Sequence, residues 1–281
     1  MKIAISTDST CDLSKEEIIR ENINIVPLHV ILGEYEYKDG IDINPSMIYS
    51  YVEKNNILPK TSACSAGEYY EVFNNLLKEY DYVIHFNISK ECSSSGANAE
   101  LVQEEFDGKV KVIDSRHLST GQGLLVMKAC DLRKEGKDVE EIVEYINKIK
   151  DRVNTSFVID TLDYLAKGGR CSSLALIASK ILKIHPRINM ENGKLEVAKK
   201  HIGSLFSCIN SYVENLIQEN PTYDDTRVYI THTNCSPLIV DSVRNKLIEK
   251  CHFKEIKETI AGSVITSHCG KGTLGVLFIK E

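Results

Sequence analysis

Hydroxyl side chains gather at a point where a helix is expected to begin. Thr61, Ser62 and Ser65 occur in the run T-S-A-C-S-A-G-E, which ends at Glu68. The first amides of a helix lack partners within it and carry a partial positive charge, so hydroxyls beside them can bind an anion. Ser65 and Glu68 are fully explained as a capping box, whereas Thr61 needs no such role. Thr61 and Ser62 are therefore candidate anion-binding residues.

A second hydroxyl cluster precedes Gly96 and another expected helix. It consists of Ser93, Ser94 and Ser95. One capping serine would serve the helix N-terminus, and one cap does not account for three hydroxyls. Ser93 and Ser94 are therefore candidate ligand contacts.

Two features of the second half add an imidazole and a guanidinium. His268 lies in S-H-C-G-K-G, which we expect to be a glycine-rich turn between two strands, where backbone can approach a ligand closely. The ordinary alternative for such a histidine is solvation. Gly168-Gly169-Arg170 is typical of a helix C-terminus with a basic residue, and the alternative is that Arg170 binds a ligand or a partner.

The same side chains admit a catalytic alternative. A serine-type esterase or thioesterase would use Ser93 or Ser94 with His268 and an acid such as Asp8, because such triads are defined by geometry rather than by chain order. The nucleophile motif G-x-S-x-G is absent, as is the phosphate loop G-x-x-x-x-G-K-[ST].

Cofactor and metal signatures are weak. Gly270, Gly272 and Gly275 match G-x-G-x-x-G, but an expected strand follows where a dinucleotide site needs a helix, so we reject that interpretation. The nine cysteines and eight histidines are scattered without zinc spacing, and we expect reduced thiols, no metal and no cofactor.

The elements that position these residues follow from the periodicity. β-rich runs at 2–6, 25–32, 82–87 and 110–114 alternate with helical stretches, which predicts a parallel α/β sheet. Helix starts are marked by capping boxes at Ser14, Ser65 and Asp138 and by Asn44 before Pro45. Ligands of such sheets bind at the carboxyl ends of the strands, where three small polar loops occur: 8–10, 93–95 and 114–115.

A second domain is expected after a charged helix that ends near Asp151. We place the division between a first domain of residues 1–154 and a second of residues 155–281. Asn192-Gly193 predicts a hairpin turn between 187–190 and 194–199. Further expectations are helices at 174–182 and from Ser236-Pro237 to about 250, and strands at 228–231 and 274–279. This second half is a mixed-sheet α/β unit.

Composition narrows the class of protein. The 281 residues are 42% hydrophobic, enough to bury a sizeable core. With 40 acidic and 34 basic residues, the formal charge of −6 argues against nucleic acid as a partner. No apolar run approaches the roughly 20 residues that span a bilayer, and the start does not resemble a signal peptide. We expect a cytoplasmic protein without stable membrane insertion.

Together, several segments resemble the DegV family over essentially the whole chain. No single segment is specific, but their order and spacing are. They are T-D-S-T-C-D-L at 7–13, T-S-A-C-S-A-G-E at 61–68, the serines 93–95, D-S-R-H-L-S-T-G-Q-G at 114–123, L-D-Y-L-A-K-G-G-R at 162–170, L-K-I-H-P at 182–186 and G-S-V-I-T-S-H-C-G-K-G-T-L-G-V at 262–276.

The resemblance implies a lipid-binding protein rather than an enzyme. Members bind long-chain fatty acids such as palmitate, and some are the fatty-acid-binding subunit of a bacterial fatty acid kinase. It implies a three-layer α/β/α first domain and a mixed α/β second domain. Thr61 and Ser93 then correspond to the hydroxyls that bind the carboxylate, with His268 completing the site and Ser62 and Ser94 beside it. The family assigns no chemical step to the turn at Arg170, which we expect to contact a kinase partner.

This chain departs from the family pattern at three places. Ser94 stands where the family has glycine in S-G-T, Cys64 replaces the proline of T-S-x-P-S, and Lys271 replaces the proline of H-x-G-P-G. The key hydroxyls are retained. Ser93 or Ser94 is then the direct donor, and Lys271 is expected to add a cation near the head group.

Overall fold

The parallel sheet expected in the first half is present in the computed structural model, which describes residues 1–171 and 184–281. Its strands run parallel in the order β2-β1-β6-β7. Their bounds are β1 Ile3–Asp8, β2 Ile23–Val26, β6 Tyr82–Asn87 and β7 Val110–Asp114. The helices of this half are α1 Lys15–Glu21, α2 Pro45–Asn55, α3 Ala66–Leu76, α4 Ser95–Gln103, α5 Thr120–Lys134 and α6 Val139–Ile149, with short 3₁₀ turns η1 Ser9–Cys11, η2 Glu104–Phe106 and η3 Lys150–Arg152.

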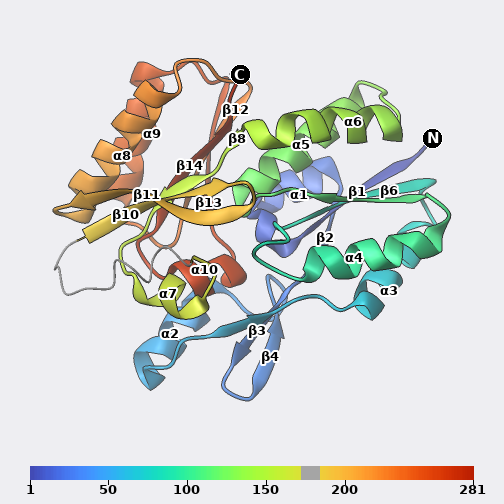
Figure 1. Ribbon diagram of the computed structural model, residues 1–281, viewed down its shortest axis with the longest axis horizontal. Coiled ribbons are helices and arrows are strands. Elements are labelled where there is room, and N and C mark those ends of the chain that lie inside the picture. The colour runs from blue at the N-terminus through green and yellow to red at the C-terminus, as the bar shows by residue number, and fades with distance from the viewer. Residues whose placement is uncertain (172–183) are drawn as a thin grey trace.

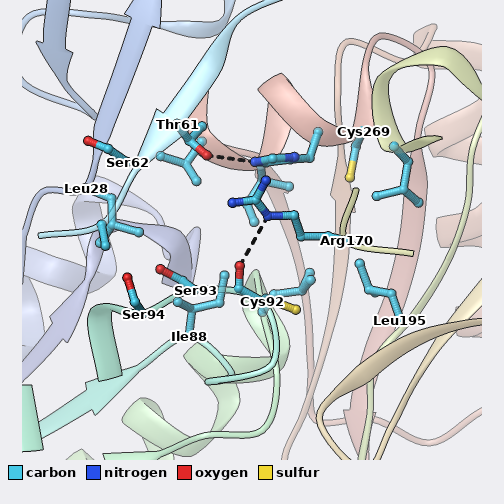
Figure 2. Close-up of a pocket in the computed structure, with 16 residues that line it drawn as sticks. Leu28, Thr61, Ser62, Ile88, Cys92, Ser93, Ser94, Arg170, Leu195 and Cys269 are labelled. Atoms are coloured by element: carbon cyan, nitrogen blue, oxygen red, sulfur yellow. Dashed lines mark hydrogen bonds between the residues drawn. The ribbon is translucent and has the colours of Figure 1, made fainter. Parts of the chain in front are cut away.

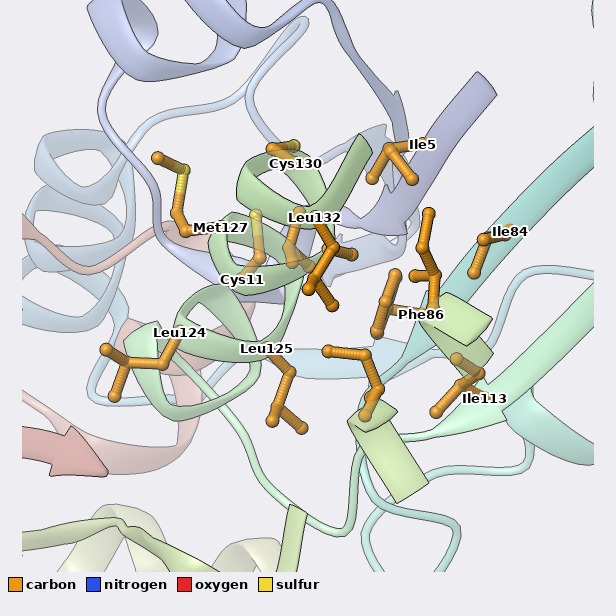
Figure 3. Close-up of a cluster of buried hydrophobic side chains, with 14 of the residues drawn as sticks. Ile5, Cys11, Ile84, Phe86, Ile113, Leu124, Leu125, Met127, Cys130 and Leu132 are labelled. Atoms are coloured by element: carbon orange, nitrogen blue, oxygen red, sulfur yellow. The ribbon is translucent and has the colours of Figure 1, made fainter. Parts of the chain in front are cut away.

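Helices cover both faces of the parallel sheet because side chains alternate along each strand. On β6, Val83 packs in a cluster with Tyr69 and Phe73 of α3. Its neighbour Ile84 points the other way, and Figure 3 shows it among apolar side chains that include Leu125 of α5. The expected three-layer α/β/α arrangement is confirmed.

The run 25–32 is not one strand, which corrects our expectation. β2 ends at Val26 in the parallel sheet, and β3, His29–Leu32, begins a separate antiparallel sheet of order β4-β3-β5. The other two strands are β4 Tyr35–Lys38 and β5 Lys60–Ser62. Pro27 lies at the break, and proline has no backbone N–H to contribute to a ladder.

The second half is built on a mixed sheet. Among the described residues its order is β11-β10-β9-β14-β12-β13, with β8 also pairing β14. Its strands are β8 Val153–Asn154, β9 Ser156–Val158, β10 Ile184–Glu191, β11 Lys194–Ile202, β12 Arg227–His232, β13 Glu255–Ile260 and β14 Leu274–Ile279. Its helices are α7 Asp163–Gly168, α8 Leu205–Glu219, α9 Pro237–Lys250 and α10 Ser263–Cys269. Of the strand pairs in the described part of this half, only β12 and β13 are parallel.

Most local expectations are confirmed. The three capping boxes form, and Asn44 caps α2. Glu191 pairs with Lys194 across a turn whose two central residues, Asn192 and Gly193, both have positive φ. The helix expected at 174–182 lies outside the described residues, as does part of the 182–186 segment.

The two halves share a core. Figure 1 shows α5 between the parallel sheet and the strands of the second half. Tyr229, Leu277 and Ile279 belong to the same apolar cluster as α5, and the Tyr229 hydroxyl donates to Glu17 Oε1 at 2.8 Å. The division between residues 154 and 155 stays a prediction. The strand β8, which lies just before it, already pairs with β14 of the second half.

The helices of the described ranges lack the length and apolar character needed to cross a bilayer.

His268 lies on a helix, which corrects the expected turn. The helix is α10, and the glycines at 270 and 272 follow it. Two buried carboxylates of the first half hold its start: Asp39 accepts from the backbone N–H of Ser263 at 2.8 Å, and Asp12 accepts from that of Gly262 at 2.8 Å. α10 is thus anchored to the first half although it belongs to the second.

Replacing Asp39 tests this anchor. Asp39→Ala leaves the first amides of α10 without their acceptor, and we expect the free energy of unfolding to fall by about 1–2 kcal/mol in urea titrations. Asp241→Ala, at an exposed position of α9, is the control and should stay within about 0.5 kcal/mol of wild type. Equal stability of the two variants would contradict the anchor.

Candidate functional site

A cavity of about 80 Å³ lies where the two halves meet, lined by the side chains of Figure 2. Polar and apolar side chains both line it. The polar part of the lining, which we call the polar end, consists of Thr61, Ser62, Ser93, Ser94, Arg170 and His268. The apolar wall includes Leu28, Ile88, Leu118, Leu165, Leu195, Val264, Ile265 and Cys269. Every candidate binding residue of the sequence therefore lines one cavity.

Thr61 and His268 are in direct contact across the two halves. Thr61 lies on β5, where it pairs with Val30 of β3, and His268 lies in the last turn of α10. The Thr61 hydroxyl and His268 Nε2 are 2.8 Å apart (Figure 2). The neighbouring Ser62 hydroxyl instead donates to the carboxylate of Glu36 at 3.1 Å.

The environment of His268 determines its protonation. Burial, with a smaller contribution from the positive charge of Arg170, lowers the pKa of the imidazole to about 4. Nδ1 is buried without a hydrogen-bond partner among the described residues. A β-carbon at Gly168 would lie 2.6 Å from Nδ1, so only glycine fits there.

These contacts assign the tautomer of a neutral His268. A proton on Nδ1 would be a buried donor without an acceptor, which is costly, so we place the proton on Nε2. Nε2–H then donates to the Thr61 oxygen. The Thr61 hydroxyl hydrogen is left available to donate to a ligand in the cavity.

The serine cluster divides its roles. α4 begins at Ser95, and the Ser94 side chain forms no cap. The Ser93 hydroxyl accepts from the Ser95 backbone N–H at 3.2 Å and donates to the Ser95 hydroxyl at 3.1 Å. Ser94 is exposed, and within the described part of the chain its hydroxyl has no hydrogen bond.

Ser95 joins the two hydroxyl loops, a role that the sequence did not reveal. Its side chain is fully buried and accepts from the backbone N–H of Cys64 at 3.3 Å. Asn98, one turn further along α4, donates to the Cys64 carbonyl at 2.8 Å. The loop after Thr61 is therefore tied to the helix that follows Ser93. Three adjacent serines predict a helix cap, whereas the burial of Ser95 depends on tertiary packing that the sequence pattern does not show.

Beneath these loops, Asp8 is a fully buried carboxylate at the end of β1. It accepts from the Tyr69 hydroxyl at 2.6 Å, from the Ile88 backbone N–H at 3.0 Å and from the Asn87 amide. Ile88 begins the loop that carries Ser93, so Asp8 fixes the start of that loop.

The hydrolase alternative lacks its contacts in this arrangement. His268 bonds to Thr61 rather than to Ser93 or Ser94, and the imidazole near Asp8 is that of His85, at 3.4 Å. In the described ranges no group of His, Cys, Asp or Glu side chains is suited to hold a metal ion.

Arg170 follows the left-handed C-cap Gly169 of α7 and reaches the polar end of the cavity. It donates to the carbonyl oxygens of Gly168 at 2.6 Å and Cys92 at 3.4 Å. Among the residues that the structure describes, no carboxylate forms an ion pair with it. Lys271, expected near the head group, is exposed and does not line the cavity.

An outer pocket of about 410 Å³ shares Thr61, Arg170 and His268 with the cavity. Lys60 and Lys167 also line it, and both are exposed. The polar end of the cavity thus borders a cationic opening to solvent.

Comparisons with known proteins agree over the full length. The family model described as "Uncharacterised protein, DegV family" matches residues 2–281. A DegV domain-containing protein of Caldanaerobacter subterraneus subsp. tengcongensis is 32% identical, covering all of this chain and 99% of the relative. A DegV family protein of Thermus thermophilus, described by its fatty acid binding, superposes with a TM-score of 0.93 at 27% identity over 100% of both chains. A stearic-acid-binding protein of Eubacterium ventriosum has a TM-score of 0.85 at 27% identity over 99% and 98%.

The protonation of His268 is testable by pH. Because the folded pKa, about 4, lies below the usual 6.5, protonation opposes folding, and stability falls as pH drops below about 6.5. We expect His268→Gln to gain stability relative to wild type by at most about 2 kcal/mol between pH 7 and pH 5. Urea unfolding at both pH values measures this, and a pH-independent difference would contradict a neutral buried imidazole.

Proposed function

The chain belongs to the DegV family, and we propose that it binds a long-chain fatty acid with its carboxylate on the hydroxyls of Thr61 and Ser93. The observation that carries the proposal is the Thr61–His268 contact at the polar end of an apolar cavity. Solved relatives are described as fatty-acid-binding proteins, including those of Thermus thermophilus and Bacillus subtilis. We regard the protein as a lipid-binding protein rather than an enzyme.

The acyl tail supplies the driving force in this proposal. Burying some fifteen methylenes contributes roughly 12 kcal/mol gross, from which association and chain ordering subtract several kcal/mol. A cavity of about 80 Å³ is smaller than typical ligand pockets of roughly 300–1,000 Å³. We therefore expect the tail to enter by displacing apolar side chains of the wall.

The head group fixes the orientation of the ligand. A carboxylate that leaves water must recover hydrogen-bond donors. Thr61 supplies one donor, because His268 donates to its oxygen and leaves the hydroxyl hydrogen free. Ser93 supplies a second by turning its hydrogen from the neutral Ser95 oxygen to the ligand, which exchanges a neutral bond for a stronger charge-assisted one. The unpartnered hydroxyl of Ser94 and the hydroxyl of Ser62 lie beside them.

We further propose that the bound carboxylate is presented to a kinase subunit. The cationic outer pocket makes the polar end reachable from solvent and attracts an anionic phosphoryl donor. Arg170 belongs to both pockets and has no carboxylate partner among the described side chains, so it is the expected contact for that step.

Removing both hydroxyls tests the carboxylate site. For Thr61→Val with Ser93→Ala we expect fatty acid affinity to fall at least tenfold, since each charge-assisted bond contributes about 1.5–3 kcal/mol. Native mass spectrometry of the purified protein and titration of delipidated protein with palmitate measure this. Ser50→Ala, at an exposed position of α2, is the control. Unchanged lipid content in the folded double variant would overturn the site.

Arg170→Ala separates binding from presentation. We expect the variant to retain its lipid but to be phosphorylated at least tenfold more slowly by an ATP-dependent fatty acid kinase subunit. Arg116→Ala, whose side chain is paired with Asp151, is the matched control. Phosphorylation of Arg170→Ala at the wild-type rate would contradict the assigned role.

A further inference from the structure

A second cavity, of about 20 Å³, adjoins the first and is enclosed by α10 and by the strands β9, β12 and β14. The two cavities share three lining residues, Leu118, Ile265 and Cys269. All three are apolar and at most 7% exposed. They form a wall between the cavities, which we call the partition.

The two cavities lie on neighbouring faces of α10. Val264 and His268, one turn apart, line only the first cavity, whereas Ile265 and Cys269, also one turn apart, line both. A tail that starts beside His268 and passes around α10 therefore meets the partition before the second cavity.

The second cavity is suited to an apolar occupant. Its hydroxyls are already paired: Thr231 with Thr120 at 2.6 Å, Thr233 with the Gly270 carbonyl at 2.5 Å and Thr273 with the Cys269 carbonyl at 3.0 Å. With no polar group left to solvate, water gains little there, whereas methylenes gain from burial.

The far end of the second cavity is closed by backbone. Gly275 of β14 approaches β9 so closely that a β-carbon there would lie 2.8 Å from the Ser156 carbonyl oxygen. The start of α10 is held by Asp12 and Asp39, so the helix cannot simply move outward. The side chains of the partition are thus the part of this path that a substitution can open.

We infer that the partition, and Ile265 above all, determines the longest acyl tail that the protein accepts. This inference rests on the proposed fatty acid binding. It assigns the chain-length selectivity of that binding to the side chains of the partition. In wild type the tail ends against Ile265. Removing that side chain joins the two cavities and makes room for further methylenes, each adding about fourfold in affinity.

The test compares saturated acids of increasing length with delipidated protein. We expect Ile265→Ala to lengthen the preferred tail by about two carbons and to raise affinity for the longer acid roughly 15-fold relative to the wild-type optimum. Val243→Ala, at a buried position of α9 that lines neither cavity, is the control and should keep the wild-type preference. Ala261→Val, which fills the second cavity, should cancel the gain when combined with Ile265→Ala.

The outcomes separate this inference from the function on which it rests. An unchanged preference in Ile265→Ala, an equal shift in Val243→Ala, or a gain that persists in the double variant overturns the partition. Wild-type protein that binds none of the acids overturns the proposed function itself. Thermal unfolding checks that each variant is folded. If Ile265→Ala does not fold, Leu118→Ala takes its place, with the same expected change in chain-length preference.

Discussion

The carboxylates of Asp12 and Asp39 hold the start of α10, and the arrangement of the site depends on this contact. α10 belongs to the second half of the chain, yet its first amides donate to these two side chains of the first half. With its start fixed, the helix presents His268 to Thr61 and Ile265 to the apolar path. The proposed head-group contact and the lining of the proposed tail path thus both depend on one short helix.

Burying acids at this junction is costly, and the structure offsets the cost with donors. Burial raises the pKa of Asp12 to about 8, although the Ser119 hydroxyl and the Gly262 amide counteract the effect. Asp8 receives donors from the Tyr69 hydroxyl and the Ile88 amide. Each of these carboxylates accepts from an element that carries a site residue or leads to one. Their burial therefore defines where the loops and α10 lie relative to one another.

The site combines a rigid polar end with an adaptable apolar path. Ser95 ties the loop after Thr61 to the loop that carries Ser93, and His268 is packed against Gly168 without space for a β-carbon. The proposed tail path has only the side chains of the partition between its two cavities. Such a division suits a protein that recognises one head group and measures the chain attached to it.

The sequence by itself determined the local elements: the capping boxes, the Asn192-Gly193 hairpin and the parallel strands all follow from short patterns, and the family motifs identified Thr61, Ser93 and His268. It did not determine how they meet. Thr61 and His268 are 207 residues apart, and their contact depends on how α10 docks. The break after Val26, the helix that carries His268 and the burial of Ser95 were likewise decided by the tertiary structure. Local patterns encode backbone preferences over a few residues, whereas these features depend on packing between segments distant in the chain.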